Sequence, residues 1–419
     1  MENFNGFNLP PALLQAVQKL GFDKPTPIQA QAIPLGLAGK DIMGSAQTGT
    51  GKTAAFGIPL VAKLMHSPQS AALVLTPTRE LAAQVLKQLQ ALVGQNGTIR
   101  SALLIGGDSM GKQLGQLRGH PRLIVGTPGR INDHLVRRTL DLSHTNFLVL
   151  DETDRMLDMG FGQQLEKIVH HMPKDRQTLM FSATLPPNIM KMAAQYLRHP
   201  ERIAVGSLIA AAPKIRQELI HTGETEKYGK LVELLEARTG SILVFVKTKH
   251  GADRLAQKLA KNNHSTDAIH GDLRQRQRDR VIQNFRDKKH RIMVATDVAA
   301  RGLDIPHIEH VINYDLPQAP EDYIHRIGRT ARAGAEGSAI CLITPADGLK
   351  WRAIHRLMNP GAPPPAGLAT TSAPRSGRPG GRPSYKPGGN ADHKPAGKKP
   401  WQKKSFSRGP RQGERKAAH

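Results

Sequence analysis

Short apolar runs that end in polar motifs recur along the chain between residues 72 and 343. Four of them read ALVL before TPTREL, LIV before GTPGR, FLVL before DETD and LMF before SAT. Four more read ILVF before VKT, IMVA before TDVAARGLD, VINY before DLP and AICLI before TPAD. Runs this short predict strands buried on both faces, and amphipathic stretches such as 80–92 predict helices between them. The pattern therefore predicts two doubly wound α/β lobes with parallel sheets.

The spacing of these runs also gives a domain plan. The two sets are separated near residues 206–213, and few large apolar side chains occur after residue 358. At 419 residues the chain is long enough for two or three domains. We therefore predict an N-terminal segment at 1–30, a first lobe at 31–207, a second lobe at 214–358 and a tail at 359–419.

One segment before the first set matches a phosphate-binding loop. Residues 41–53 read DIMGSAQTGTGKT. Gly49 and Gly51 let the backbone curl, so that N–H groups and a helix N-terminus face phosphate oxygens. Lys52 can then reach the β and γ phosphates of a nucleotide, and the Thr53 hydroxyl can bind Mg²⁺. The alternative is an ordinary turn after a strand.

Three acids follow another apolar run. Residues 148–154 read LVLDETD, and carboxylates at the carboxyl end of such a strand lie where open α/β sheets bind ligands. Asp151 would hold the Mg²⁺ ion, and Glu152 would orient and deprotonate an attacking water. The loop and the acids together predict an ATP site.

Nine motifs in a fixed order resemble those of a DEAD-box RNA helicase. They read GFDKPTPIQ, AQTGTGKT, PTREL, TPGR, DETD, SAT, VFVKT, ATDVAARGLDI and HRIGRTARAG. The resemblance covers about residues 4–350, and it implies two RecA-like lobes with ATP and RNA crossing the cleft between them. The length, the basic tail and the sequence around the first motif look most like the bacterial RhlE-like subgroup.

The resemblance extends the nucleotide site beyond the loop. The amide of Gln29 can pair with both the donor and the acceptor on an adenine edge, a geometry that guanine would not match. An aromatic at the position of Phe4 stacks on the base in this family. The cofactor-binding residues are then Phe4, Phe22, Gln29, Ala46, Gln47, Thr48, Gly49, Thr50, Gly51, Lys52, Thr53 and, at the ribose, Asp304. The alternative for residues 21–29 is a turn made rigid by proline before a helix.

Hydrolysis is expected to need both lobes. By resemblance, Arg329 and Arg332 reach the γ phosphate as arginine fingers, so lobe closure completes the site. The expected catalytic residues are Lys52, Asp151, Glu152, Arg329 and Arg332. Coupling of ATP to RNA is expected at Asp154, Ser182, Thr184 and His325. The hydroxyls of Ser182 and Thr184 should bond to the DETD segment, with plain strand-end capping as the alternative.

RNA is expected to be bound through its backbone rather than its bases. Small residues and helix starts suit close approach to phosphates, and 2′-hydroxyl contacts would distinguish RNA from DNA. A strand bent in this way cannot remain paired, which implies short-range unwinding. The family's contacts correspond to Pro77, Thr78, Arg79, Gly106, Gly107, Thr127, Gly129, Arg130, Lys247, Thr248, Gln275, Arg278, Thr296 and Gly302.

The composition is compatible with an RNA partner in the cytoplasm. A net charge of +25 favours a polyanionic ligand. The single cysteine, Cys341, excludes an intramolecular disulfide and suits a reducing compartment. The N-terminal residues lack the pattern of a signal peptide, and no apolar run approaches the ~20 residues of a membrane span. We therefore expect cytoplasmic localisation and no membrane partner.

Three positions depart from the expected motifs. Ala46 stands at the first Gly of the loop pattern, and Thr153 replaces the alanine of the DEAD sequence. The Thr153 hydroxyl would need a partner if buried. Ala331 occupies a position that is usually Gly in the family, and a positive φ there would cost alanine about 1 kcal/mol and could misplace Arg332. None of the three changes the lysine, metal or base positions.

Two other functional classes stay open from the sequence. A DNA-directed helicase would share the phosphate loop and the acids, although GFDKPTPIQ favours the RNA group. A non-catalytic RNA clamp or annealer would also be basic, but it need not retain Lys52, Glu152 and the arginines. Structured RNA, ribosomal precursors and the RNA-decay machinery are candidate partners.

The tail differs in composition from the lobes. Residues 361–419 contain 13 Lys or Arg and 2 Asp or Glu, and so supply +11 of the net charge of +25. They are rich in Gly and Pro and poor in large apolar side chains, so we expect disorder. Clustered cations favour a nonspecific RNA tether, and Trp401 and Phe406 could stack on unpaired bases. The alternative is a tail that only improves solubility.

Deleting residues 361–419 is expected to preserve RNA-dependent ATP turnover while weakening RNA binding. Every predicted catalytic motif ends by residue 334, and the deleted cations release counterions from RNA. Unwinding should suffer most at low RNA concentration, because tethering raises the local concentration of RNA. RNA titrations at several salt concentrations test this, and equal affinities and salt slopes for both proteins would leave solubility as the tail's role.

Overall fold

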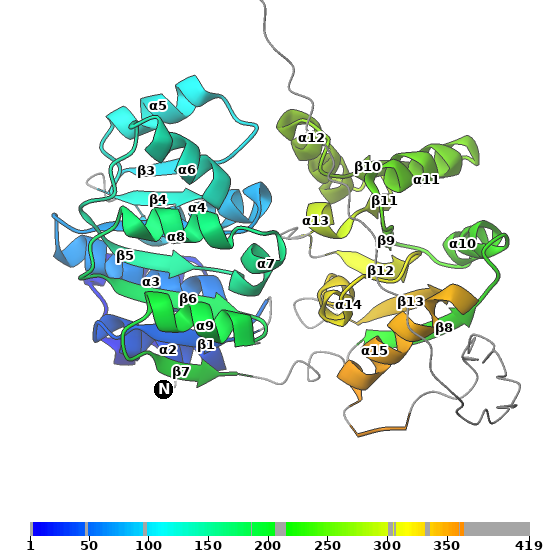
Figure 1. The fold of residues 1–419 in the computed structure, drawn as a ribbon, viewed down its shortest axis with the longest axis horizontal. Helices are drawn as coiled ribbons and strands as arrows, with labels where there is room; N and C mark the ends of the chain where they lie inside the picture. The colour runs from blue at the N-terminus through cyan, green and yellow to red at the C-terminus, as the bar shows by residue number, and fades with distance from the viewer. Residues whose placement is uncertain are drawn as a thin grey trace, which may run out of the picture. The chain divides into compact units, whose positions relative to one another are not determined.

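A computed structural model of the chain describes residues 3–46, 49–94, 99–185, 187–205, 215–300, 305, 307–331, 336–359 and 361–363. The chain divides into a unit of residues Met1–Thr370 and a unit of residues Thr371–His419. The first unit contains two separate sheets, each with its own helices (Figure 1). The predicted joint at 206–213 lies outside the described residues, and so does the predicted tail apart from Asn359 and residues 361–363.

The first sheet has seven strands in the order β3-β4-β2-β5-β6-β1-β7, and its neighbours pair in parallel. The strands are β1 (Ile42–Ser45), β2 (Ala71–Leu75), β3 (Ser101–Leu104), β4 (Leu123–Gly126), β5 (Thr145–Leu150), β6 (Gln177–Ser182) and β7 (Glu201–Ala204). The helices are η1 (Phe4–Phe7), α1 (Pro11–Lys19), α2 (Pro27–Leu37), α3 (Lys52–His66), α4 (Arg79–Val93), α5 (Met110–Arg118), α6 (Pro128–Val136), α7 (Thr153–Asp158), α8 (Gly162–His170) and α9 (Pro187–Tyr196).

The second sheet has six strands in the order β10-β11-β9-β12-β13-β8, again with parallel neighbours. Its strands are β8 (Ile215–His221), β9 (Ser241–Phe245), β10 (Thr266–Ile269), β11 (Ile292–Ala295), β12 (Ile308–Asn313) and β13 (Gly337–Ile343). Its helices are α10 (Lys227–Glu236), α11 (Lys249–Lys261), α12 (Gln275–Arg286), α13 (Asp297–Ala300), α14 (Pro320–Ile327), η3 (Pro345–Asp347) and α15 (Gly348–Met358).

Both sheets are covered on both faces. In β2, Val74 belongs to one apolar core and Leu73 to another, because successive side chains point to opposite faces. In β9, Val244 and Leu243 are divided in the same way. Double burial explains why the central strands read as continuous apolar runs.

The predicted fold class is confirmed for both lobes. Each of the eight apolar runs forms a strand, and the amphipathic stretch 80–92 lies within α4. The prediction did not identify the four edge strands β3, β7, β8 and β10. Each pairs on one side only, and β8 has a single buried residue, Ile215, so none has the long apolar signature of a central strand.

The Thr153 hydroxyl has the partner that its burial requires. The side chain is fully buried, and Oγ1 lies 3.3 Å from the carbonyl oxygen of Leu150 and 3.1 Å from that of Phe181. These carbonyls belong to the neighbouring strands β5 and β6. The departure from alanine therefore adds a link between the two strand ends.

Ala331 has a positive φ of 55°, which is the conformation that the motif's usual glycine would favour. Its methyl group packs against the apolar cluster that contains Tyr323 and Trp351. The expected conformational cost is therefore present, partly offset by apolar contact.

No helix within the described ranges is long and apolar enough to cross a membrane.

Replacing Ala331 with Gly is expected to raise the free energy of unfolding by about 0.5–1 kcal/mol, because glycine adopts a positive φ without the cost that Cβ imposes. Chemical denaturation of both proteins measures the difference. Ala260→Gly is the matched control: Ala260 is exposed in α11, so glycine there should lower stability by about 1 kcal/mol. A loss of stability at both positions would contradict the strain at Ala331.

Candidate functional site

The described part of the loop between β1 and α3 contains two glycines in the left-handed conformation that a phosphate-binding loop uses. Gly49 and Gly51 have φ of 83° and 91°, and Gly51 is the N-cap of α3. A Cβ on Gly51 would also collide with the amide of Gln29, so this position excludes a side chain for two reasons. Ala46 continues the strand, since its N–H donates to the carbonyl of Ser182 at 3.1 Å. The predicted residues Gln47 and Thr48 lie outside the described residues.

Lys52 begins α3 with a buried ammonium group. The residue is 7% exposed, and Nζ has no hydrogen-bond partner among the described residues. An unpaired buried cation is costly, and it lies at the positive end of the helix dipole. The site therefore has the electrostatic character of an anion site, and a phosphate fits it.

Two acids at the end of β5 lie close to this cation. Asp151 and Glu152 are 3% and 4% exposed, and the Glu152 N–H donates to Asp151 Oδ1 at 3.0 Å. Burial raises the pKa of Asp151 to about 6, although the charge of Lys52 acts in the opposite direction. A cation bound at Asp151 would offset the cost of this buried carboxylate.

Arg155 is a site residue that the sequence prediction missed. Its Nη1 donates to Glu152 Oε2 at 3.0 Å, and both side chains are nearly inaccessible to solvent. Glu152 itself has a left-handed backbone, with φ of 51°, at the start of α7. A cation directly after the DETD acids was the available signal in the sequence.

The segment at residues 26–29 is bonded to the phosphate loop. The Thr26 hydroxyl donates to the carbonyl of Thr50 at 2.8 Å, and Gln29 Nε2 donates to the carbonyl of Gly51 at 3.1 Å. Gln29 Oε1 accepts from the Thr26 N–H at 2.9 Å. One N–H and one lone pair of the Gln29 amide are thus used by the protein, which leaves one of each for another ligand.

Phe4 and Phe22, both predicted to bind the cofactor, lie together in the structure, but Phe4 is not exposed. Their ring centroids are 6.2 Å apart with an interplanar angle of 29°, and Phe7 packs on Phe4 at 5.7 Å. Phe4 is only 3% exposed. Base stacking on Phe4 stays a prediction, and it would require one face of this ring to open.

The expected contacts between the DETD segment and the SAT motif are present. Asp154 Oδ2 accepts from the N–H groups of Ala183 and Thr184, both at 3.0 Å, and from the Thr184 hydroxyl at 3.2 Å. The Asp154 N–H donates to Ser182 Oγ at 3.3 Å. The two strand ends of β5 and β6 therefore cannot move independently.

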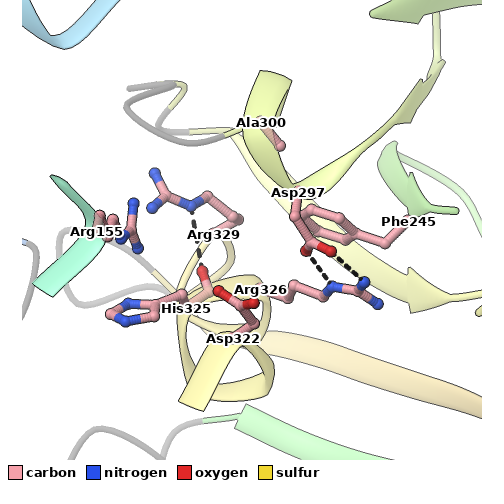
Figure 2. Close-up of a pocket in the computed structure, with 8 residues that line it drawn as sticks. All are labelled: Arg155, Phe245, Asp297, Ala300, Asp322, His325, Arg326 and Arg329. Atoms are coloured by element: carbon pink, nitrogen blue, oxygen red, sulfur yellow. Dashed lines mark hydrogen bonds and ion pairs between the residues drawn. The ribbon is translucent and has the colours of Figure 1, made fainter. Parts of the chain in front are cut away.

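The HRIGR motif of the second lobe lies on and just after α14. Arg326, which the prediction did not include, binds both oxygens of Asp297 at 2.6 and 2.7 Å (Figure 2). Arg329 donates through Nε to the carbonyl of His325 at 3.2 Å, and these residues line one pocket with Arg155. Arg332 and Asp304 lie outside the described residues.

A second pocket, of about 360 Å³, gathers most of the predicted RNA contacts of the first lobe. The predicted RNA contacts that line this pocket are Pro77, Thr78, Arg79, Gly106, Thr127, Gly129 and Arg130 of the first lobe and Arg278 of the second. Thr78 and Thr127 are the N-caps of α4 and α6, so two helix N-termini face this region. Gly107 has φ of 78°, and a Cβ there would collide with the guanidinium of Arg79.

The predicted RNA contacts of the second lobe are only partly gathered here. Arg278 Nε lies 2.6 Å from Glu80 Oε1, and its Nη1 donates to the carbonyl of His270 at 3.0 Å. Gln275 Oε1 lies 3.5 Å from Nη1 of Arg79. The pocket lining does not include Gln275, Lys247, Thr248 and Thr296. Gly302 lies outside the described residues.

Among the described residues, no group of three or more His, Cys, Asp or Glu side chains could hold a metal ion. A Mg²⁺ ion at Thr53 and Asp151 would therefore take most of its oxygen ligands from phosphates and water, as this ion usually does.

Comparison with known proteins extends this picture to most of the chain. The family DEAD/DEAH box helicase matches residues 26–192, and the helicase conserved C-terminal domain matches residues 226–334. DEAD-box ATP-dependent RNA helicase CshA of Bacillus subtilis is 45% identical over 84% of this chain and 72% of its own length. CshA of Geobacillus kaustophilus is 45% identical over 82% of this chain and 74% of its own length.

A solved structure of S. cerevisiae Dbp5 bound to RNA and ADP BeF3 is similar to this chain over most of the length of both. It has a TM-score of 0.77 and 33% sequence identity, and the match covers 86% of this chain and 94% of that chain. The relatives named CshA give no support to the RhlE-like subgroup. Identity and coverage at this level show that this chain belongs to the DEAD-box RNA helicases.

Proposed function

We propose that this chain is an RNA-dependent ATPase that locally unwinds or remodels RNA duplexes and RNA–protein complexes through ATP-driven closure of two lobes. One observation carries the proposal: Lys52 presents a buried, unpaired ammonium at the start of α3, beside Asp151 and Glu152. A nucleotide phosphate would pair this cation, and the acids supply the groups that hydrolysis needs. We also propose the domain division into residues 1–30, 31–207, 214–358 and 359–419.

ATP binding is assigned to the loop and to the segment before it. Backbone N–H groups of residues 46–53 and the start of α3 would hold the phosphates, with Lys52 at the β and γ positions. Gln29 would contact adenine with the part of its amide that the loop does not use. Its bond to the Gly51 carbonyl supports a link between base recognition and the position of the phosphates.

Glu152 is assigned as the general base for the attacking water. Its carboxylate is paired with Arg155 and lies next to Asp151, so the base is held in place before substrate arrives. Arg329 and Arg332 would stabilise the charge of the transferring phosphoryl group. Neither lobe alone contains all of these groups, so turnover depends on closure.

Thr53 and Asp151 are the residues that would hold Mg²⁺. When bound, this ion neutralises phosphate charge and orients the oxygens for displacement. The raised pKa of Asp151 supports this assignment, because a buried carboxylate without a cation is disfavoured in its charged form.

RNA coupling is assigned to the Asp154 network and to the pocket beside α4 and α6. Asp154 holds the Ser182 to Thr184 segment, so a shift of the acids would move the end of β6. Arg278 is paired with Glu80 and would have to exchange this partner for an RNA phosphate. Backbone contacts with 2′-hydroxyl groups would give the preference for RNA.

The cellular setting is proposed from composition. We infer a cytoplasmic protein that acts on structured or duplex RNA, with ribosomal precursors and the RNA-decay machinery as candidate partners. Assignment to the RhlE-like subgroup stays a prediction.

The function is tested by steady-state ATP turnover with RNA and with DNA of the same sequence. RNA is expected to stimulate turnover strongly and DNA weakly, because only RNA offers 2′-hydroxyl contacts. Equal stimulation would favour a DNA-directed or unspecific helicase. No turnover with either nucleic acid would favour an RNA clamp.

Glu152→Gln is the matched variant for the chemical step. Glutamine keeps the shape of the side chain but is not a base, so turnover should fall by about 10²–10⁴-fold while ATP and RNA binding persist. Lys52→Ala should instead weaken ATP binding itself. Near-normal turnover by the Glu152 variant would remove its assigned role.

A further inference from the structure

Helix α11 of the second lobe carries a stripe of exposed cationic side chains. The stripe consists of five exposed residues, which are Lys247, His250, Arg254, Lys258 and Lys261. At about 100° of rotation per residue, the four helical members and the projected position of Lys247 fall within an arc of about 80°. The length from His250 to Lys261 is about 17 Å at 1.5 Å per residue. We call this set the α11 stripe.

The orientation of the α11 stripe is fixed by packing. The opposite side of α11 is buried against the sheet through Ala252, Leu255, Ala256 and Leu259. The helix cannot rotate about its axis without exposing these residues to water. The cationic side chains therefore stay together on the solvent-facing side of α11.

No acid on α11 neutralises the stripe. Asp253, the single acid of this helix, lies outside the arc and bonds to His270 at 2.8 Å. Lys249, also outside the arc, pairs with Asp272 at 2.6 Å. Within the described part of the chain, no salt bridge joins a stripe residue to an acid. On α12, by contrast, Asp279 interrupts the basic residues.

One stripe residue is held in position by an aromatic ring. The Lys258 ammonium lies 3.4 Å from the centroid of Tyr228, and the Tyr228 hydroxyl donates to the Lys258 carbonyl at 3.3 Å. Asn262 donates to the same hydroxyl at 3.0 Å. The ring face is thus used by a cation and the stripe itself contains no Phe, Tyr or Trp, so its chemistry suits phosphates rather than stacked bases.

The stripe is continuous with a predicted RNA contact. It starts at Lys247, next to Thr248, which is the N-cap of α11. From there it follows the helix away from the carboxyl end of β9. An RNA backbone held at Lys247 and Thr248 would therefore meet an unneutralised cationic surface as it continues.

We propose that the α11 stripe binds the phosphodiester backbone of RNA beyond the stretch held by the motif residues, an inference that rests on the proposed RNA-dependent function. The four Lys and Arg side chains of the α11 stripe carry permanent positive charges that match a polyanion. Their contacts would release counterions from the phosphates. The backbone can belong to a single strand or to a flanking duplex, and the experiment distinguishes these sources.

The test uses the full-length variant Arg254→Gln/Lys261→Gln, which leaves the predicted motif contact Lys247 and the ring-bound Lys258 unchanged. RNA affinity is measured by fluorescence anisotropy over a series of salt concentrations. Loss of two phosphate contacts should weaken binding roughly tenfold at low salt and flatten the slope of log K against log salt by about 1.4 for a single strand. ATP turnover at saturating RNA should be unchanged.

The matched control is Lys288→Gln/Lys289→Gln. Both lysines are exposed after α12, which packs on the opposite face of the same sheet, and the variant removes the same charge. It should bind RNA nearly as tightly as the unmodified protein. Equal losses for both variants would show a general charge effect and overturn the proposal.

Three RNA ligands locate the contact. A strand of about six nucleotides, long enough only for the motif residues, should bind equally to the stripe variant and the unmodified protein. A longer single strand, or a duplex with a single-stranded overhang, should show the loss, and the one with the larger loss identifies the source. Equal affinities and slopes on all three ligands would overturn the proposal.

Folding and function are checked separately. If Arg254→Gln/Lys261→Gln melts at a lower temperature, Arg254→Lys/Lys261→Arg must restore RNA binding, since it keeps the charges; failure of this rescue would overturn the proposal. If RNA does not stimulate ATP turnover by the unmodified protein, the proposed function fails. If stimulation is normal and the stripe variant binds RNA normally, only the stripe proposal fails.

Discussion

A strand buried on both faces can present polar chemistry only at its ends, and the candidate sites of this protein follow from that constraint. The central strands of both sheets are mostly apolar, with cores on either side. β1 leads into the phosphate loop, β5 ends one residue before Asp151, and β6, which pairs with both, ends at Ser182. Parallel pairing therefore gathers these groups along one edge of the sheet.

The charged groups of the candidate sites differ in whether the protein itself pairs them. Lys52 has no partner among the described residues, whereas Glu152 is paired with Arg155 and Arg278 with Glu80. Buried ion pairs lose much of their attraction to desolvation, so exchange of a protein partner for a ligand can be nearly balanced in free energy. Such a balance would let the binding of ATP or of RNA shift the conformational equilibrium of the protein.

Much of the fold was predictable because burial leaves a strong pattern in the sequence. The apolar runs identified the central strands, and the glycines of the loop identified α3 and its start. The edge strand β8 was not predictable in this way, since most of its residues are exposed to solvent. The ion pair of Arg155 with Glu152 and the double use of the Gln29 amide depend on tertiary contacts. A sequence without coordinates does not specify such contacts.

The conformation of Ala331 shows the value of a conditional prediction. The sequence indicated a cost only if the backbone required a positive φ, and the structure has that φ. The Thr153 departure was resolved similarly, by two carbonyls that lie far apart in the chain. In both cases the residue type indicated a possible energetic cost, and the tertiary structure determines whether that cost is present.

The central claim is that ATP and RNA binding are thermodynamically coupled through the strand-end groups. The most direct measurement is the affinity of the full-length protein for RNA, with and without a non-hydrolysable ATP analogue and Mg²⁺. A favourable coupling of about 1–3 kcal/mol predicts tighter RNA binding by roughly 5- to 150-fold, and the same factor for the analogue when RNA is present. An RNA affinity that does not change when the analogue binds would contradict the account.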